Sequence, residues 1–349
     1  MSELRNSSDI LSENRLIEIL GRISNVRIGI IGDGALDVYW EADMTKSELS
    51  RETPHFPLPV FRERFSGGGG ANVAANISAL KPAQVTMITM IGEDWRGDLF
   101  IKTLKDNNIN TDYLVISKER VTPAYCKPIR RGISGIEYED PRIDFQNYSV
   151  LTPAEEQEII SNLEKMYREV DVIAVADQLF FGTITENVRK KLQEISEKGT
   201  PVVVDSRDRV GLYSEVIVKP NETEACRVID PSINPADITD EIIYRAAKEI
   251  HTRNNRPAII TLGPRGALWI ENGIITNIPT VPEEPPIDIC GAGDTFISAL
   301  VCTLAAGASG PEAISIANLA AGVTVKKVGT TGTSTREEII DKYRNRFVR

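Results

Sequence analysis

A glycine-rich turn near residue 291 carries the residue types best suited to chemistry. Gly-Ala-Gly-Asp at 291–294 lies between a proline-rich run at 279–286 and an apolar run at 295–306. This pattern predicts a loop that leads into the N-terminus of a helix. The first backbone N–H groups of a helix have no partner within it, and glycines let a ligand approach them closely. The turn could therefore bind a phosphate or a developing oxyanion.

Asp294 falls in the first turn of that predicted helix. Its carboxylate could cap the helix, or it could act as a general base aimed at a hydroxyl beside the anion-binding turn. The short motif is compatible with both roles. The choice depends on what the rest of the chain places around it.

The composition is that of an ordinary globular protein with an acidic surface. The 349 residues include 40 Lys and Arg and 50 Asp and Glu, which gives a formal charge of -10, and 41% are hydrophobic. No basic block typical of nucleic-acid binding is present. No apolar run approaches the roughly 18 residues of a membrane span, and the first residues lack the apolar core of a signal peptide. We therefore expect a cytoplasmic protein that binds neither nucleic acid nor membrane.

The cysteines show no metal-binding or disulfide pattern. All four are far apart in the sequence: Cys126, Cys226, Cys290 and Cys302. This spacing predicts reduced thiols, and the two histidines also lack metal-ligand spacing. Cys290 precedes the predicted helix start, where a thiol can have a lowered pKa.

Strands and helices alternate along most of the chain. Runs rich in Val and Ile predict strands at 26–32, 85–92, 171–177, 201–205, 216–219 and 258–263. Helical patterns fall between them, and an amphipathic run at 10–20 predicts a leading helix. We therefore expect a mostly parallel sheet with helices on both faces. Ligands bind at the carboxyl ends of such strands, where Asp33 and Asp37 follow the first strand.

Two segments, at about 38–64 and 121–148, depart from this alternation and resemble short strands with turns. We interpret them as insertions that form one small lid sheet over the main sheet of a single domain, residues 1–349. A lid would exclude water from a transfer reaction. Because exposed strand edges are usually covered, we also predict a homodimer clasped through the lid. Separately, four glycines at 67–70 run directly into a small-residue helix, which predicts close approach of the backbone to a neighbour or ligand.

Together, the glycine run, the Gly-Ala-Gly-Asp turn and the strand-end aspartates resemble the PfkB family of ribokinase-like carbohydrate kinases. The resemblance extends from about Arg27 to Thr335. Within the family, residues 32–40 and 50–61 are similar to segments of the kinases that act on D-glycero-β-D-manno-heptose 7-phosphate. The resemblance implies a three-layer α/β sandwich with a small β-sheet lid. It also implies ATP-dependent phosphorylation of a sugar or sugar-phosphate hydroxyl, with Mg²⁺ as cofactor.

The same resemblance implies roles for individual residues. Asp294 would be the catalytic base, and the anion hole would be formed by Gly291, Ala292 and Gly293. Carboxylate, amide and backbone groups for the sugar would come from Asp37, Gly67, Gly68 and Asn72. The nucleotide positions would be Asn221, Glu224, Thr261, Gly263, Gly266, Asn318 and Gly322. Glu224 would hold Mg²⁺ through water, and Asp288 would be a ligand of a monovalent cation such as K⁺.

The chain also departs from the heptose kinases. Residues 176–182 lack a lysine that could meet a sugar phosphate, and Arg130, Arg142 or Arg207 could supply that charge instead. Cys290 stands where the family usually has threonine. A fused nucleotidyltransferase domain, which heptose kinases often carry, is not expected here. Fructose, ribose or a nucleoside are alternative acceptors, and a non-catalytic sugar or nucleotide sensor is the alternative outside the enzymes.

Overall fold

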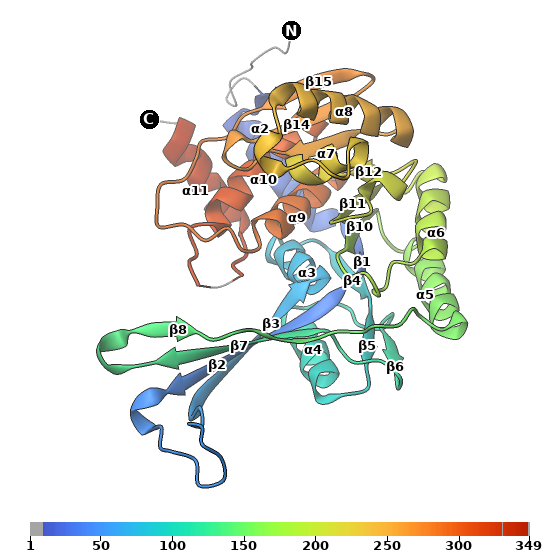
Figure 1. The fold of residues 1–349 in the computed structure, drawn as a ribbon. Helices are drawn as coiled ribbons and strands as arrows, with labels where there is room; N and C mark the ends of the chain where they lie inside the picture. The colour runs from blue at the N-terminus through green and yellow to red at the C-terminus, as the bar shows by residue number, and fades with distance from the viewer. Residues whose placement is uncertain (1–9, 330, 348–349) are drawn as a thin grey trace.

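The computed structural model describes residues 10–329 and 331–347 (Figure 1). Its main sheet has the strand order β15-β14-β13-β12-β11-β10-β1-β4. The bounds are Arg27–Gly32 (β1), Gln84–Ile88 (β4), Val172–Asp177 (β10), Val202–Ser206 (β11), Ile217–Val218 (β12), Ala258–Thr261 (β13), Ala267–Glu271 (β14) and Ile274–Ile278 (β15). Neighbouring strands from β4 to β13 are parallel, and β14 and β15 add an antiparallel edge. The mostly parallel sheet is confirmed, whereas the antiparallel edge was not predicted.

Strand β10 shows why this sheet has helices on both faces. All six of its residues are buried. Val172 and Ala174 belong to one hydrophobic cluster, and Ile173 and Val175 belong to another. Alternate residues of a strand point to opposite faces, so a continuous run of apolar residues requires cover on both sides.

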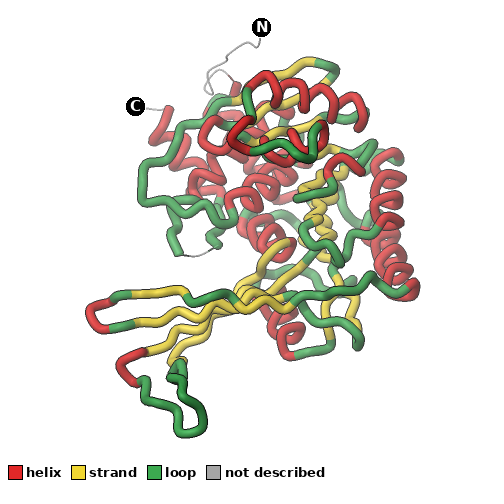
Figure 2. Tube along the Cα trace, in the orientation of Figure 1, coloured by secondary structure: helices red, strands yellow, loops and turns green. Residues whose placement is uncertain are grey.

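Helices supply that cover, as the tube in Figure 2 shows. The first cluster includes residues of α2 (Glu13–Arg22), α3 (Gly70–Ala79), α4 (Trp95–Asp106), α9 (Ala292–Ala305), α10 (Gly310–Thr324) and α11 (Arg336–Phe347). The second includes residues of α5 (Pro153–Met166), α6 (Glu186–Glu197), α7 (Glu222–Ile229) and α8 (Asp240–Asn254). Among the helices of the described residues, none is long and apolar enough to cross a membrane.

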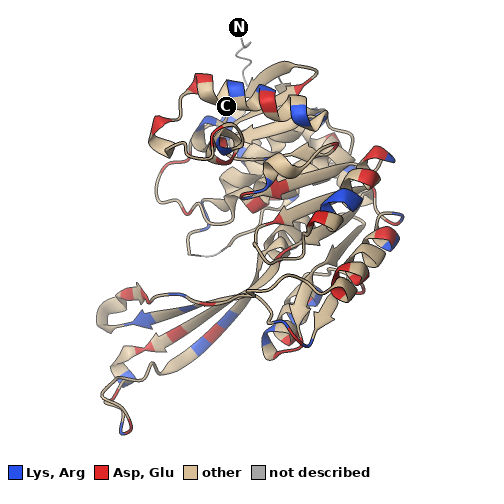
Figure 3. Ribbon diagram, turned by 45° about the vertical axis from the view of Figure 1, so that its right-hand side comes forward, with Lys and Arg blue, Asp and Glu red and all other residues tan. Residues whose placement is uncertain are grey.

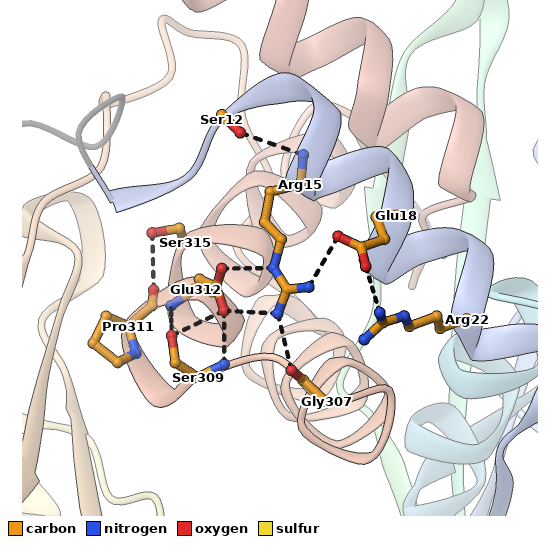
Figure 4. Close-up of polar contacts among 9 residues, drawn as sticks. All are labelled: Ser12, Arg15, Glu18, Arg22, Gly307, Ser309, Pro311, Glu312 and Ser315. Carbon is orange, nitrogen blue, oxygen red and sulfur yellow. Dashed lines mark hydrogen bonds and ion pairs between the residues drawn. The ribbon is translucent and has the colours of Figure 1, made fainter.

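The leading helix expected from the sequence is α2, which an ion pair joins to the start of α10 (Figure 4). Ser309 and Glu312 form a capping box at that start, and Ser309 N–H donates to the Glu312 carboxylate at 2.8 Å. Arg15 Nε donates to the same carboxylate at 2.8 Å, and Arg15 Nη2 donates to the Gly307 carbonyl at 3.0 Å. One glutamate thus caps α10 and holds α2.

The single strand predicted at 85–92 is wrong, because the chain changes sheets at Thr89. Strand β5 (Met90–Gly92) pairs with β6 (Val115–Ser117) in a separate two-stranded sheet, and β4 stays in the main sheet. The hydroxyl of Thr89 accepts a hydrogen bond from Gly34 N–H at 3.0 Å. The Thr89 side chain thus satisfies the backbone N–H of Gly34, at the start of β2.

A second sheet projects from the body as a long arm (Figure 1). This lid sheet contains β2 (Gly34–Asp43), β3 (Val60–Gly69), β7 (Ala124–Arg131), β8 (Glu137–Glu139) and β9 (Ile143–Phe145). Acidic and basic residues both occur along it (Figure 3), and the buried Glu41 of β2 pairs with Arg64 at 2.9 Å and Arg131 at 3.2 Å. The predicted three-layer fold with a small separate sheet is thus confirmed.

Candidate active site

Helix α9 places Asp294 beside two side-chain amides. Gly291, the N-cap of α9, has φ 78°, a left-handed conformation that favours glycine, and no side chain caps the helix there. Asn72 Nδ2 donates to Asp294 Oδ2 at 2.7 Å, and Gln178 Nε2 lies 3.5 Å from Oδ1. The carboxylate therefore faces amides from α3 and from the loop after β10, which supports the general-base interpretation over the capping one.

Burial raises the pKa of Asp294 to about 6. The hydrogen bond from Asn72 and the charges of Lys219 and Arg207 oppose this rise, and the charge of Asp205 adds to it. A pKa near 6 leaves the carboxylate mostly ionised at neutral pH while making it a stronger base than an exposed aspartate.

Asp294 lines a pocket of about 250 Å³ below the lid sheet. The pocket residues come from the lid sheet, α3, α9 and the loops around residues 142, 178, 207, 290 and 331: Asp37, Gly68, Gly69, Asn72, Tyr125, Lys127, Arg142, Gln178, Arg207, Cys290, Gly291, Gly293, Asp294 and Thr331. The structure thus brings together most of the residues predicted for the sugar and the anion hole. Gly67 and Ala292 do not line it, and the Ala292 N–H donates to the Ile289 carbonyl at 3.2 Å.

The glycine run approaches protein neighbours closely, as the sequence indicated. A Cβ at Gly67 would lie 2.8 Å from the Cβ of Ala71, and one at Gly68 would lie 3.3 Å from the Asp37 carboxylate. Gly69 has φ 56° at the point where β3 turns into α3. These glycines let β3, β2 and α3 meet at the edge of the pocket.

Three cationic side chains line the same pocket. Lys127 Nζ lies 3.7 Å from Asp37 Oδ1 and 3.2 Å from the Tyr39 hydroxyl. The guanidinium of Arg142 stacks 4.3 Å from the centre of the Tyr125 ring. Sequence reasoning missed Lys127, although Tyr125 and Lys127 stand two apart on β7, a spacing that places both on one face of the strand.

Arg207 is the third cation, and within residues 10–329 and 331–347 it forms no ion pair. By contrast, Arg142 donates to the Asp144 carboxylate through Nε at 2.6 Å and through Nη2 at 2.7 Å. Arg130, the remaining arginine considered from the sequence, pairs with Asp140 and does not line the pocket. Lys127 lies beside Asp37 and Arg142 is paired with Asp144, so Arg207 is the pocket cation that has no carboxylate partner among the described residues.

Asp33 does not face the pocket, in contrast to the expectation from its place after β1. It is 3% exposed, and its carboxylate accepts backbone N–H bonds from Gln178, Leu179 and Thr183. Burial raises the pKa of Asp33 to about 6, although these hydrogen bonds oppose the rise.

Asn221 and Glu224 form a capping box at the start of α7. Asn221 Oδ1 accepts from Glu224 N–H at 2.9 Å, and Glu224 Oε2 accepts from Asn221 N–H at 2.8 Å. Burial raises the pKa of Glu224. Thr261 ends β13 next to this cap, because its N–H donates to the Pro220 carbonyl at 3.0 Å. The left-handed glycines of the following turn are Gly263 and Gly266.

A buried ion pair near this cap was missed by sequence reasoning. Lys219, at the end of β12, is 3% exposed and lies 3.1 Å from Asp205 at the end of β11. Burial favours a lower pKa for Lys219, but the charges of Asp205, Glu224 and Asp294 outweigh it and the pKa is raised. The only sequence signal was a polar residue at each of two strand ends.

Two of the expected nucleotide residues lie beneath α11. Asn318 is 9% exposed, and its Nδ2 lies 3.5 Å from the Ile278 carbonyl. A Cβ at Gly322 would meet Lys342 at 2.6 Å and Glu283 at 3.0 Å. Glu283 pairs with Lys342 at 2.8 Å and also with Arg346. These charged side chains lie over Gly322, away from the pocket of Asp294.

Asp288 and Cys290 belong to the loop before α9. Asp288 Oδ1 accepts from Cys290 N–H at 2.9 Å, and Oδ2 accepts from Gly329 N–H at 3.0 Å. The aspartate therefore joins the two loops. Burial raises the pKa of the Cys290 thiol, the opposite of the lowering that a helix start can cause. All four cysteines are free, as predicted.

A family model, a curated relative and two solved structures each match most of this chain. A family model described as pfkB family carbohydrate kinase matches residues 59–337. The "Bifunctional protein HldE" of Trichlorobacter lovleyi is 31% identical over 341 residues, covering 94% of this chain and 65% of that protein's length. The phosphofructokinase-2 of Escherichia coli in complex with fructose-6-phosphate has a TM-score of 0.68 at 21% identity, covering 92% of this chain and 99% of that one. The ribokinase of Arabidopsis thaliana complexed with ribose and ATP gives 0.65 at 21%, covering 91% and 98%.

Proposed function

The chain belongs to the pfkB family of carbohydrate kinases, and from this we propose that it transfers the γ-phosphoryl group of ATP to a hydroxyl of a sugar that already carries a phosphate. A heptose 7-phosphate is the first candidate, because residues 32–40 and 50–61 resemble the kinases that act on it. Free fructose, free ribose and a nucleoside are the alternative acceptors.

The observation that carries this proposal is the convergence of Lys127, Arg142 and Arg207 on the pocket of Asp294. A neutral sugar presents hydroxyl groups, which Asp37, Asn72 and backbone groups can bind without added charge. A phosphate carries negative charge and several acceptor oxygens, which arginine and lysine bind through charge-assisted hydrogen bonds. The guanidinium of Arg207, which forms no ion pair with the described residues, therefore favours a phosphorylated acceptor.

In the proposed reaction, Asp294 takes the proton of the acceptor hydroxyl. The hydroxyl oxygen then forms a bond to the γ-phosphorus of ATP, and the bond from that phosphorus to the β–γ bridging oxygen breaks, so that ADP leaves. The N–H groups of Gly291 and Gly293 at the start of α9 would stabilise the transferred group. The raised pKa of Asp294 suits a base that works near neutral pH.

The residues at α7 fit a role beside the nucleotide phosphates. Among the described residues, no group of three or more His, Cys, Asp or Glu side chains is arranged to hold a metal. Mg²⁺ in kinases keeps several waters and needs few protein ligands, and the Asn221 bond to Oε2 leaves Oε1 of Glu224 for a metal-bound water. The ion would neutralise phosphate charge. Thr261, Gly263 and Gly266 would border the nucleotide with Asn318 and Gly322, and Asp288 would lie beside a bound K⁺.

ADP release should be measured with MgATP and matched pairs of sugars and sugar phosphates. We expect turnover on a phosphorylated acceptor and its loss in Asp294→Asn. Arg142→Gln should raise the KM for that acceptor about tenfold or more, because one charge-assisted hydrogen bond contributes ~1.5–3 kcal/mol. The KM for ATP should stay unchanged. Arg130→Gln, which removes a lid arginine outside the pocket, is the control.

A free sugar used as efficiently as its phosphate, with no effect of Arg142→Gln, would contradict the proposed acceptor. ATP binding with no turnover on any acceptor would instead favour the non-catalytic sensor.

A further inference from the structure

Asp33 connects the two segments that deliver amides to Asp294. Its carboxylate accepts hydrogen bonds from the backbone N–H groups of Gln178 at 2.8 Å, Leu179 at 2.6 Å and Thr183 at 2.6 Å. Its carbonyl accepts from Gly70 N–H at 2.8 Å, at the start of the helix that carries Asn72. A single buried residue thus anchors both the loop of Gln178 and the helix of Asn72.

The loop after β10 depends on this anchor for its shape. Its residues form neither a helix nor a strand between 178 and 185, so its backbone N–H groups need partners outside regular structure. A Cβ at Gly182 would lie 2.0 Å from Asp33 Oδ1, so the loop wraps tightly around the carboxylate. Arg120 and Arg209 bind the carbonyls of Phe181 and Leu179 from outside.

We propose that Asp33 is a positioning residue for phosphoryl transfer, which acts by aiming the Gln178 amide at the Asp294 carboxylate opposite Asn72. The inference rests on the proposed function, in which Asp294 is the base. Two amide donors, one on each carboxylate oxygen, fix the rotation of the carboxylate and so the direction of its free lone pairs. A base displaced by about 1 Å can lose on the order of 10²-fold in rate. The 3.5 Å separation of Gln178 and Asp294 is expected to shorten when the acceptor binds, as catalytic hydrogen bonds do.

A double-mutant cycle tests this proposal, with Asp33→Asn, Gln178→Leu and the double variant. Asp33→Asn keeps the shape but replaces one acceptor oxygen with an NH₂ group that faces backbone donors. Each single variant should lower kcat about tenfold or more with the KM for ATP unchanged. Because Asp33 acts through Gln178, the double variant should be no slower than the slower single variant.

Asp94→Asn is the matched control. Asp94 also accepts backbone N–H bonds, from Gly97 at 2.9 Å and Thr122 at 3.0 Å, but it does not line the pocket. This variant should lower the unfolding temperature and leave kcat unchanged. Thermal unfolding of all the variants then separates a loss of fold from a loss of positioning.

The outcomes distinguish this inference from the proposed function. If the wild-type protein turns over an acceptor and the effects of Asp33→Asn and Gln178→Leu multiply, or if Gln178→Leu keeps the wild-type kcat, the positioning role is overturned and the kinase stands. If the wild-type protein turns over no acceptor, both fail.

Discussion

Replacing Asn72 with alanine should move the acid limb of the pH–rate profile to higher pH. In the wild-type protein, burial raises the pKa of Asp294 to about 6, and the hydrogen bond from Asn72 at 2.7 Å opposes that rise. An amide N–H donates to the ionised carboxylate and so stabilises it. Its removal leaves the burial contribution in place, and the pKa of Asp294 must therefore increase.

The size of the pKa shift follows from the strength of the hydrogen bond that Asn72→Ala removes. A hydrogen bond to a charged group contributes ~1.5–3 kcal/mol, and one pKa unit corresponds to about 1.4 kcal/mol. The limb should therefore move up by about 1–2 units, from a pH of about 6 to between about 7 and 8. The charges of Lys219 and Arg207 act on Asp294 in both proteins, so they do not alter the difference.

The measurement is kcat/KM between pH 5 and 9, since this ratio reports the pKa of the free enzyme. Loss of a sugar contact by Asn72→Ala would lower kcat/KM at every pH without moving the limb, so the two effects separate. Asn162→Ala is the control. Asn162 is a buried residue of α5, away from the pocket, and its side-chain amide donates to the Tyr113 carbonyl. A limb that stays in place, or that moves to lower pH, would refute either the base assignment or the role of this hydrogen bond.

Two further predictions concern stability and assembly. The folded state raises the pKa of Asp294 from 3.8 to about 6, so stability from this group is complete below pH 3.8 and is lost as the pH rises through 6. The free energy of unfolding of Asp294→Asn should therefore be higher than that of the wild-type protein at pH 7.5, by up to about 3 kcal/mol, with little gain near pH 4. An equal gain at both pH values would contradict the raised pKa of Asp294. Phe61 of β3 is 52% exposed on the lid sheet. For the lid-to-lid dimer predicted from the sequence, the wild-type protein should elute at dimer mass and Phe61→Asp at monomer mass. Elution of the wild-type protein at monomer mass at all concentrations would contradict the dimer.

The parts of the site predicted from the sequence are those encoded by a few consecutive residues. The turn at 291–294 and the glycines at 67–70 impose their own backbone geometry, so their type and spacing are readable without the fold. Lys127, Gln178 and Lys219 were not predicted as site residues, because each reaches the site only through packing of elements distant in the chain. The Asp33 side chain likewise points away from the pocket because its carboxylate binds the backbone of Gln178, 145 residues further along the chain.

The alternating pattern predicted the main sheet for a similar reason, because each strand and helix must bury its own apolar face. It failed at Thr89, where a run that reads as continuous passes from the main sheet to the two-stranded sheet of β5 and β6. The edge strands β14 and β15 were also not predicted. β14 has only one β-branched residue, Ile270, and both strands pair antiparallel, outside the strand–helix repeat.

The lid sheet joins the body without a linker. Strand β2 starts at Gly34, directly after Asp33, and β3 ends at Gly69, directly before α3. A rigid-body displacement of this arm would also move Asp37 and Gly68 at its base. If self-association at the tip changes the position of the arm, it would also change the affinity for the acceptor at the base, and thermodynamic reciprocity would require acceptor binding to change the dimerisation constant by the same factor. For a lid-to-lid dimer, the acceptor affinity becomes a function of the protein's own concentration.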